Sequence, residues 1–143
     1  MPTYTVKTSN IKLSRKKKKL IPKGITKTHT RITQANNFFA QVIFEVNKIT
    51  SHYIGGKIVK AKQIFIYGQI RAGRAPKIKK KLIISLRNSI TKNSGISKDN
   101  SWVYLLDLTP EQMIEYGEIL PKSGKEASWF TSLSSSLQKK LKK

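Results

Sequence analysis

The chain has 143 residues and no cysteine, and its 29 lysine and arginine residues against 7 acids give a net charge of +22. This length predicts one domain over residues 1–143, the lack of cysteine excludes disulfides and thiolate metal sites, and no apolar run approaches the length of a membrane span. No apolar segment typical of a secretory signal follows the N-terminus, so we expect a cytoplasmic protein that does not bind membranes.

The first part of the chain, residues 2–50, reads as a β-α-β unit. Tyr4 and Val6 alternate with polar neighbours, which predicts a short strand that starts at Pro2. A helix is expected next, over residues 14–34.

This first helix contains a conflict, because Pro22 and Gly24 lie inside it. Proline in a helix interior costs about 3 kcal/mol relative to alanine, and glycine about 1 kcal/mol, so the helix is expected either to be kinked or to begin later. Its apolar stripe consists of Leu20, Ile25 and Ile32. The strand predicted after it, over residues 39–46, carries on one face Val42, Phe44 and Val46.

The second part, residues 62–108, repeats this order after a hairpin or loop excursion over residues 57–61 that follows Gly55 and Gly56. A helix is expected to start near Pro76, because proline suits the first helical position. The apolar residues of this helix recur at helical spacing: Ile78, Leu82, Ile83, Leu86 and Ile90. Strands are expected on either side of it, over residues 63–70 and 102–106.

Residues 109–143 form a C-terminal segment. Thr109 offers a capping hydroxyl and Pro110 suits a first helical turn, so a short helix is predicted to about Leu120. The basic tail over residues 138–143 is expected to fray.

Two tandem β-α-β units predict an α/β fold with one mainly four-stranded sheet. Each unit would supply a parallel pair of strands joined by a right-handed crossover, and both helices are expected on the same face. The other face of the sheet would then be open, and apolar residues such as Val42 and Phe44 would have to be covered.

The positive charge is uneven along the chain. Residues 1–98 contain a single acid, Glu45, whereas the other six acids all lie in residues 99–143. Such a field attracts polyanions and steers anionic ligands toward the molecule. Because most of the cations are lysines in runs without interleaved aromatic residues, we favour solvated helix surfaces, and nucleic acid is the alternative partner.

A proline at position 2 can supply a group that no internal residue can. Removal of Met1 would turn Pro2 into a free secondary amine, and an α-amine titrates near ~7.7–8.0, which suits proton transfer at neutral pH. Several groups elsewhere in the chain could act with this amine: His29, Arg71, Arg74, Tyr104 and Glu115. No metal-ligand spacing or phosphate-binding glycine loop accompanies them, so neither a metal nor a cofactor is expected.

These residues and their surroundings resemble the cis-3-chloroacrylic acid dehalogenase family of the tautomerase superfamily. The resemblance runs from Pro2 to about Leu133 and includes the stretches NFFAQVIFEV, IYGQIRAGR, WVYLLDLTPEQMIEYGEILP and SWFTSLSS. It implies a homotrimer of tautomerase-like subunits whose N-terminal proline is exposed by removal of Met1.

The resemblance also implies a role for each candidate residue. Arg71 and Arg74 would clamp the carboxylate of a small anionic substrate, which the guanidinium fork favours. His29 would add a hydrogen bond to that carboxylate. Glu115, helped by Tyr104, would activate a water molecule.

Protonated Pro2 would then deliver a proton to the α-carbon of a 3-substituted acrylate or of an alkynoate. The expected function is therefore a hydratase or dehalogenase that needs no cofactor. Two alternatives remain open. One is a keto–enol tautomerase in which neutral Pro2 acts as the base, and the other is a basic nucleic-acid-binding protein without catalysis.

Overall fold

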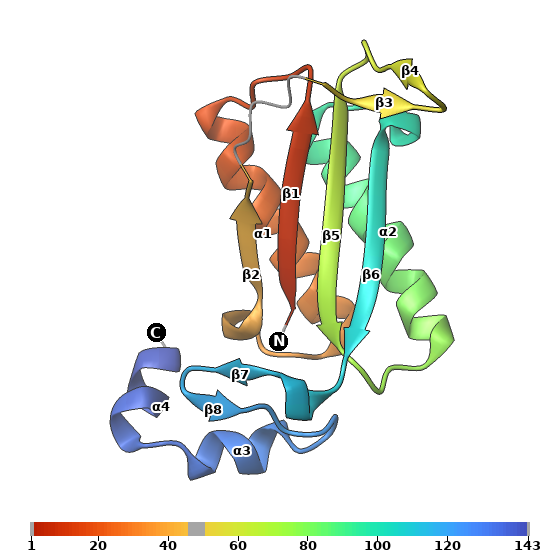
Figure 1. Cartoon of the computed structure of the whole chain (residues 1–143). Helices are drawn as coiled ribbons and strands as arrows, with labels where there is room; N and C mark the ends of the chain where they lie inside the picture. The colour runs from red at the N-terminus through yellow and green to blue at the C-terminus, as the bar shows by residue number, and fades with distance from the viewer. Residues whose placement is uncertain (1, 46–50, 143) are drawn as a thin grey trace.

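The computed structural model describes residues 2–45 and 51–142, in which a four-stranded sheet is covered on one face by two long helices (Figure 1). The strand order is β2-β1-β5-β6, with β1 parallel to β2, β5 parallel to β6, and β1 antiparallel to β5. The strands are β1 (Thr3–Ser9), β2 (Gln41–Phe44), β5 (Gln63–Arg71) and β6 (Ser101–Leu108). The predicted parallel pairs and their union in one sheet are confirmed.

The first helix, α1 (Arg15–Thr33), runs without interruption through Pro22, so the late start is wrong. The Ser14 side chain caps it by accepting a hydrogen bond from the backbone of Lys17 at 3.2 Å. Burial of Ile21 and Ile25 stabilises the helix by about 1.5–3 kcal/mol each, which is enough to offset an interior proline. The apolar stripe also differs from the prediction, since Ile21 is buried and Leu20 is 39% exposed.

The second helix, α2 (Pro76–Ser94), begins at Pro76 as predicted and ends at Gly95, whose φ of 75° closes the last turn. Three of its predicted apolar residues are buried against the sheet and α1, namely Leu82, Leu86 and Ile90. Short 3₁₀ turns precede β2 and β6, at η1 (Asn37–Phe39) and η2 (Lys98–Asn100). Among the described residues, no helix is both long and apolar enough to cross a membrane.

The two faces of the sheet differ in what covers them. Val42 and Phe44 lie beside Tyr4 and Val6 in the strand register and pack against the core under the helices, so their placement on the open face is wrong. Val46, predicted beside them, lies outside the described residues. The open face instead exposes Ile43, Trp102, Tyr104 and Leu106.

Two small hairpins extend the fold at opposite ends of the sheet (Figure 1). The predicted excursion is the hairpin of β3 (Tyr53–Ile54) and β4 (Lys57–Ile58), which turns at Gly55 and Gly56. The second hairpin consists of β7 (Ile114–Glu115) and β8 (Glu118–Ile119).

This second hairpin replaces the predicted helix to Leu120, which is therefore wrong. Helical geometry lasts for one 3₁₀ turn, η3 (Pro110–Gln112). Tyr116 and Gly117 then take positive φ values of 56° and 86° and reverse the chain, as a two-residue hairpin turn requires. The capping signals at the start fit a single turn as well as a helix.

The C-terminal residues also differ from the frayed tail that was predicted. After α3 (Glu126–Ser132), the chain forms α4 (Ser135–Leu141), and Leu141 is buried. The Ser134 hydroxyl caps α4 by accepting a hydrogen bond from the backbone of Leu137 at 3.3 Å. This burial and capping hold the tail in place.

Gly68 in β5 makes room for the ring of Tyr4. The two residues are neighbours in the β1–β5 register, and a Cβ atom at position 68 would lie 2.5 Å from Cε1 of Tyr4 and 2.9 Å from Cδ2 of Leu105. Tyr4 belongs to the packed core and Leu105 packs against it, so the tyrosine ring cannot move away cheaply.

We therefore expect Gly68→Ala to lower the free energy of unfolding by about 1–3 kcal/mol, the usual cost of overpacking a core. Urea unfolding would measure this change. Gly24→Ala is the matched control, because its Cβ would meet only the side-chain ends of Asn93 and Ser89, which line a groove and would have to give up one mutual hydrogen bond of 3.3 Å, worth about 1 kcal/mol. Alanine also favours a helix over glycine by about 1 kcal/mol, so this control should be near neutral. Equal losses in the two variants would contradict the packing argument.

Candidate active site

The candidate active site lies at the end of the sheet where β1 begins and where β5 and β6 end (Figure 1). Pro2 is buried there, and its carbonyl oxygen accepts a hydrogen bond of 2.9 Å from the backbone nitrogen of Gln41. The backbone nitrogen of Ala72 donates to the carbonyl oxygen of Leu108 at 2.7 Å, which keeps the ends of β5 and β6 paired. The topology thus brings position 2 to the same edge as the loop that carries the two predicted arginines.

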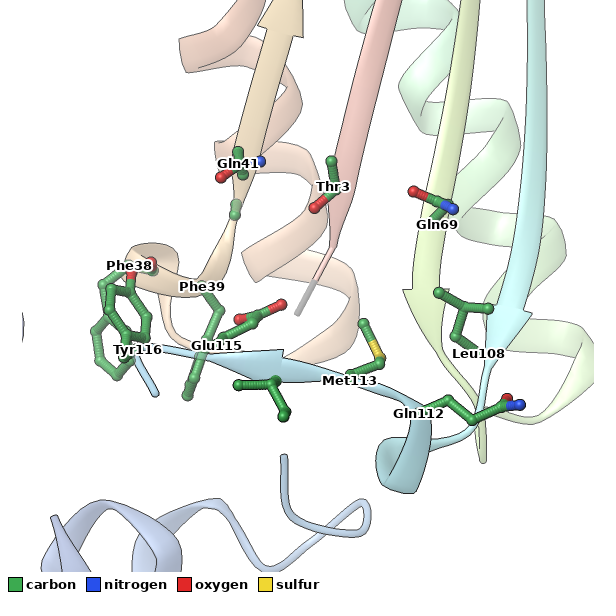
Figure 2. A pocket seen from close by; sticks show the side chains of 12 residues that line it. Thr3, Phe38, Phe39, Gln41, Gln69, Leu108, Gln112, Met113, Glu115 and Tyr116 are labelled. Atoms are coloured by element: carbon green, nitrogen blue, oxygen red, sulfur yellow. Dashed lines mark hydrogen bonds between the residues drawn. The ribbon is translucent and has the colours of Figure 1, made fainter. Parts of the chain in front are cut away.

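A pocket of about 660 Å³ opens between this edge and β7. Its walls combine polar side chains from the strand ends with aromatic and apolar side chains, among them Thr3, Gln41, Gln69, Phe38, Phe39 and Met113. Figure 2 shows Glu115 rising from β7 with its carboxylate directed toward the beginning of β1. The prediction of a helix around Glu115 is wrong, yet this residue lines the pocket from the short strand instead.

A buried polar pair lies beneath this edge, between β1 and α1. The hydroxyl of Tyr4 and Nδ1 of His29 are 2.7 Å apart, and their rings meet edge to face with centroids 5.8 Å apart. Both side chains are almost fully excluded from solvent. Among the described residues, Nε2 of His29 has no hydrogen-bond partner.

Burial keeps both members of this pair neutral, and a neighbouring cation adds to the effect on His29 only. Burial, followed by the positive charge of Arg74, lowers the pKa of His29 to about 3. Burial raises the pKa of Tyr4, and the opposing effect of Arg74 is smaller. At neutral pH the pair is therefore an imidazole and a phenol.

Arg71 lies at the end of β5, at the edge where it was expected, but its side chain is already bound to other residues. Its side chain is 1% exposed, its Nη1 donates to the carbonyl oxygen of Pro121 at 2.6 Å, and its Nη2 forms an ion pair with Glu126. Burial alone would raise the pKa of Glu126, but hydrogen bonds from Arg71 and from backbone groups outweigh it and lower that pKa. Nε of Arg71 is buried and unpartnered among the described residues.

Arg74 lies beside this ion pair and beside the Tyr4–His29 pair. Its Nη1 donates to the carbonyl oxygen of Arg71 at 2.5 Å. Burial and then the charge of Arg71 lower the pKa of Arg74, while Tyr4 and Glu126 oppose that shift. The loop thus gathers two guanidinium groups, one of which is committed to the C-terminal segment.

Tyr104 is not brought to this cluster within the single chain. It stands on the open face of the sheet, 52% exposed, in edge-to-face contact with Phe65 at a centroid distance of 5.0 Å. Position 104 lies four residues along β6 from Leu108 at the site edge, which is about 13 Å of extended chain.

Two residues of this region were missed in the sequence. Tyr4 was assigned only to a strand, and Glu126 was not assigned at all. Because Tyr4 is hydrogen-bonded to a residue 25 positions away and Glu126 is paired with one 55 positions away, only a three-dimensional arrangement could reveal them. In the described part of the chain, no three histidine or carboxylate side chains gather closely enough to hold a metal ion.

A family profile described as "Putative oxalocrotonate tautomerase enzyme" matches residues 1–132. The chain therefore belongs to this family and, with it, to the tautomerase superfamily. None of the curated proteins matches the sequence significantly.

Solved structures also resemble this chain. The crystal structure of N1, a member of the cis-3-chloroacrylic acid dehalogenase family, superposes with a TM-score of 0.93 at 27% identity over 98% of both chains. Two further structures share the fold alone. Pt0534 inactivated by 2-oxo-3-pentynoate has a TM-score of 0.74 at 20% identity over 82% of this chain and 94% of that one. A fused 4-OT symmetric trimer has a TM-score of 0.75 at 16% identity with the same coverage.

These matches confirm the tautomerase-like α/β fold and the resemblance to the cis-3-chloroacrylic acid dehalogenase family. They also support the assignment of the chain to an enzyme family. The reaction and the roles of individual residues do not follow from the matches.

The lowered pKa of His29 makes stability depend on pH. Unfolded histidine binds a proton below its usual pKa of 6.5, whereas folded His29 resists protonation until about 3. The unfolded state therefore binds more protons in between, and the free energy of unfolding should fall by up to ~1.4 kcal/mol per pH unit as pH drops from about 6.5 to 5.

Denaturant unfolding at several pH values in this window would measure that slope. His29→Gln should flatten it, and His52→Gln is the control that should retain it. The pKa of Glu126 is lowered below the usual range of a glutamate by its hydrogen bond with Arg71, so its contribution to the slope falls mainly at more acidic pH. A wild-type stability that does not change across the window would show that His29 is not buried in its neutral form.

Proposed function

We propose that the protein adds water to a 3-substituted acrylate or an alkynoate without a cofactor. The single observation that supports this most is the placement of Glu115, which reaches from β7 into the pocket toward the beginning of β1. Pro2 does not line this pocket itself, but its neighbour Thr3 does, and the proposal places a small anionic substrate between Glu115 and the amine of position 2. An acid and a base on opposite sides of a substrate are what hydration needs.

Pro2 is the general acid in this proposal. The group exists only after Met1 has been removed, because an amide-linked proline nitrogen cannot carry a proton. An α-amine titrates near ~7.7–8.0, so much of it is protonated at neutral pH. The neutral state of His29 leaves one cation fewer near the amine, which helps Pro2 to keep its proton.

In this proposal the carboxylate of the substrate is bound by His29 and the two arginines. None of the three lines the pocket, and His29 and Arg71 are buried, so the substrate has to displace the groups that cover them. Arg74 has a partly exposed side chain, and its Nη1 donates a hydrogen bond to a backbone oxygen. Both terminal nitrogens of Arg71 are already bonded to Pro121 and Glu126. Arg71 therefore offers the substrate its positive charge and its buried Nε. A bidentate grip by Arg71 would require one of those partners to be exchanged.

The proposed steps balance in atoms and charge. Glu115 removes a proton from water, and the water oxygen bonds to the β-carbon of the substrate. The electron pair of the double or triple bond moves to the α-carbon, where it takes the proton of Pro2. With a halogen on the β-carbon, the resulting halohydrin loses halide and a proton to give malonate semialdehyde. With an alkynoate, the product is the enol of a 3-oxo acid.

Keto–enol tautomerisation is the alternative at the same site, and it differs in what it asks of Glu115. Proton transfer between the enol oxygen and the carbon needs neutral Pro2 and residues that bind the substrate carboxylate, whereas hydration needs an activated water.

We expect Glu115→Gln to abolish hydration of 3-haloacrylates and alkynoates while leaving phenylpyruvate tautomerisation within a few-fold of wild type, because glutamine keeps the shape but cannot act as the base. Product assays on both substrate classes would measure the two activities, with Glu111→Gln on the exposed η3 turn as the control.

Equal loss of both activities would mean that Glu115 positions Pro2, and unimpaired hydration would mean that another group activates water. Full hydration activity in protein that retains Met1 would contradict the role of Pro2. If wild-type protein turns over no acrylate but is retained on DNA in a strongly salt-dependent way, the nucleic-acid-binding alternative replaces the proposal.

We also propose that three subunits assemble through the open faces of their sheets. This face exposes Ile43, Trp102, Tyr104 and Leu106, which is more apolar surface than one strand layer normally leaves in water. Assembly would cover these residues, and a role for Tyr104 in catalysis requires that it reach the site of a neighbouring copy. A fused 4-OT with the same fold forms a symmetric trimer.

Leu106→Lys should dissociate the assembly, because burying an unpaired lysine in an interface is costly. Sedimentation at micromolar concentration should report about three subunits for the wild type and one for this variant. Ile84→Lys is the matched control, since Ile84 on α2 is 42% exposed and Leu106 is 43% exposed, and it should leave the trimer intact. A monomeric, active wild type would contradict the proposal.

A further inference from the structure

The contact between Tyr4 and His29 indicates which ring nitrogen of His29 carries the proton. Neutral imidazole carries one N–H and one bare nitrogen, and a phenol has one O–H to donate. Two arrangements are therefore compatible with the 2.7 Å separation of the Tyr4 hydroxyl and Nδ1 of His29. Either the hydroxyl donates to Nδ1 and the ring proton sits on Nε2, or Nδ1–H donates to the hydroxyl oxygen.

The two arrangements leave different numbers of buried groups unsatisfied. In the first, Nε2–H is the one donor left without a partner. In the second, two groups are unsatisfied among the described residues: the O–H of Tyr4 has no acceptor, and the bare Nε2 of His29 has no donor. A buried donor or acceptor left unsatisfied is destabilising, so the first arrangement is favoured.

The surroundings hold the Tyr4 hydroxyl in the place that this arrangement needs. The ring of Tyr4 lies over Gly68, where even a methyl group would come within 2.5 Å of its Cε1. The edge-to-face contact with the imidazole fixes the angle between the rings at 70°. Tyr4 is fully buried, so water does not compete for the hydroxyl.

We propose that Tyr4 is a positioning residue that fixes the tautomer of His29, so that Nε2 always carries the proton and serves as a neutral donor to the substrate carboxylate. That Nε2 donates to a substrate carboxylate rests on the proposed function. That Nε2 carries the proton follows from the hydrogen bonds of Tyr4 and His29 and does not depend on the proposed function. The neutral donor binds a carboxylate without adding a charge beside Arg74.

Nitrogen NMR of labelled protein without ligand, at about pH 7, tests the tautomer directly. In the wild type, we expect the signals of His29 to show a protonated Nε2 and a bare Nδ1. Tyr4→Phe keeps the ring but removes the donor, and it should populate the Nδ1–H form. His52 is the internal reference in the same spectrum. A wild-type His29 protonated at Nδ1, or a tautomer unchanged by Tyr4→Phe, would overturn the proposal.

Kinetics then test whether Tyr4 acts through His29. Tyr4→Phe should lower kcat/KM for the carboxylate substrate about fivefold, the effect of one hydrogen bond, but by less than about twofold in a His29→Ala background. A similar loss in both backgrounds would show that Tyr4 acts in another way. Tyr53→Phe is the control, because Tyr53 is an exposed residue of the β3–β4 hairpin, and it should leave both readouts at wild-type values.

The two failures can be told apart. If the wild type converts no acrylate or alkynoate, the proposed function fails, and the NMR experiment still decides whether Tyr4 sets the tautomer. If the enzyme turns over these substrates while His29 keeps its tautomer in Tyr4→Phe, the proposed function stands and this inference fails.

Discussion

The geometry of the site depends on the ion pair between Arg71 and Glu126. It joins the end of β5 to the start of α3 across 55 positions of sequence, and the side chain of Arg71 is almost fully buried. The β7–β8 hairpin, which carries Glu115, lies in the chain between these two anchored points. The Glu126 side chain is 27% exposed, so the pair is only half buried, but loss of Glu126 would leave the buried charge of Arg71 without its partner, which is destabilising. Arg71 therefore has a structural role in addition to being a candidate for binding the substrate.

The topology explains why one edge of the sheet collects the chemistry. Because β1 and β5 run antiparallel at the centre, the beginning of one strand meets the end of the other. Pro2, the arginine loop and the segment after β6 are thereby brought together from distant parts of the sequence. The core beneath them is dry, which holds His29 and Tyr4 in their neutral forms. The charged guanidinium groups of Arg71 and Arg74 thus lie beside a core pair that is itself uncharged.

Sequence patterns predicted the elements whose signals are local. The helical spacing of Leu82, Leu86 and Ile90 and the proline at position 76 defined α2, and alternation in the strands gave the four-stranded sheet. Errors arose where two structures share one signal. Thr109 and Pro110 can begin a helix or a single turn, and the choice was made by Tyr116 and Gly117, which reverse the chain farther on. Likewise, the face on which Val42 lies depends on its register with Tyr4, which no pattern within β2 contains.

The candidate site shows the same division. Pro2, His29, Arg74 and Glu115 were named as candidates from the sequence, because unusual residue types stood at spacings that resemble a known family, and their roles stay predictions. Neither the commitment of Arg71 to Glu126 nor the partnership of Tyr4 with His29 could be named, since each joins residues from different elements. Both interactions are contacts of tertiary structure and have no counterpart in local periodicity.

The fit between Gly68 and Tyr4 also limits how this protein can evolve. Any side chain at position 68 would meet the tyrosine ring, so a larger residue there could be accepted only together with a smaller one at position 4. That second change would take away the hydroxyl that touches His29. Positions 4, 29 and 68 therefore cannot drift independently, and single substitutions among them are expected to be rejected even though only one of the three is a candidate for contact with substrate.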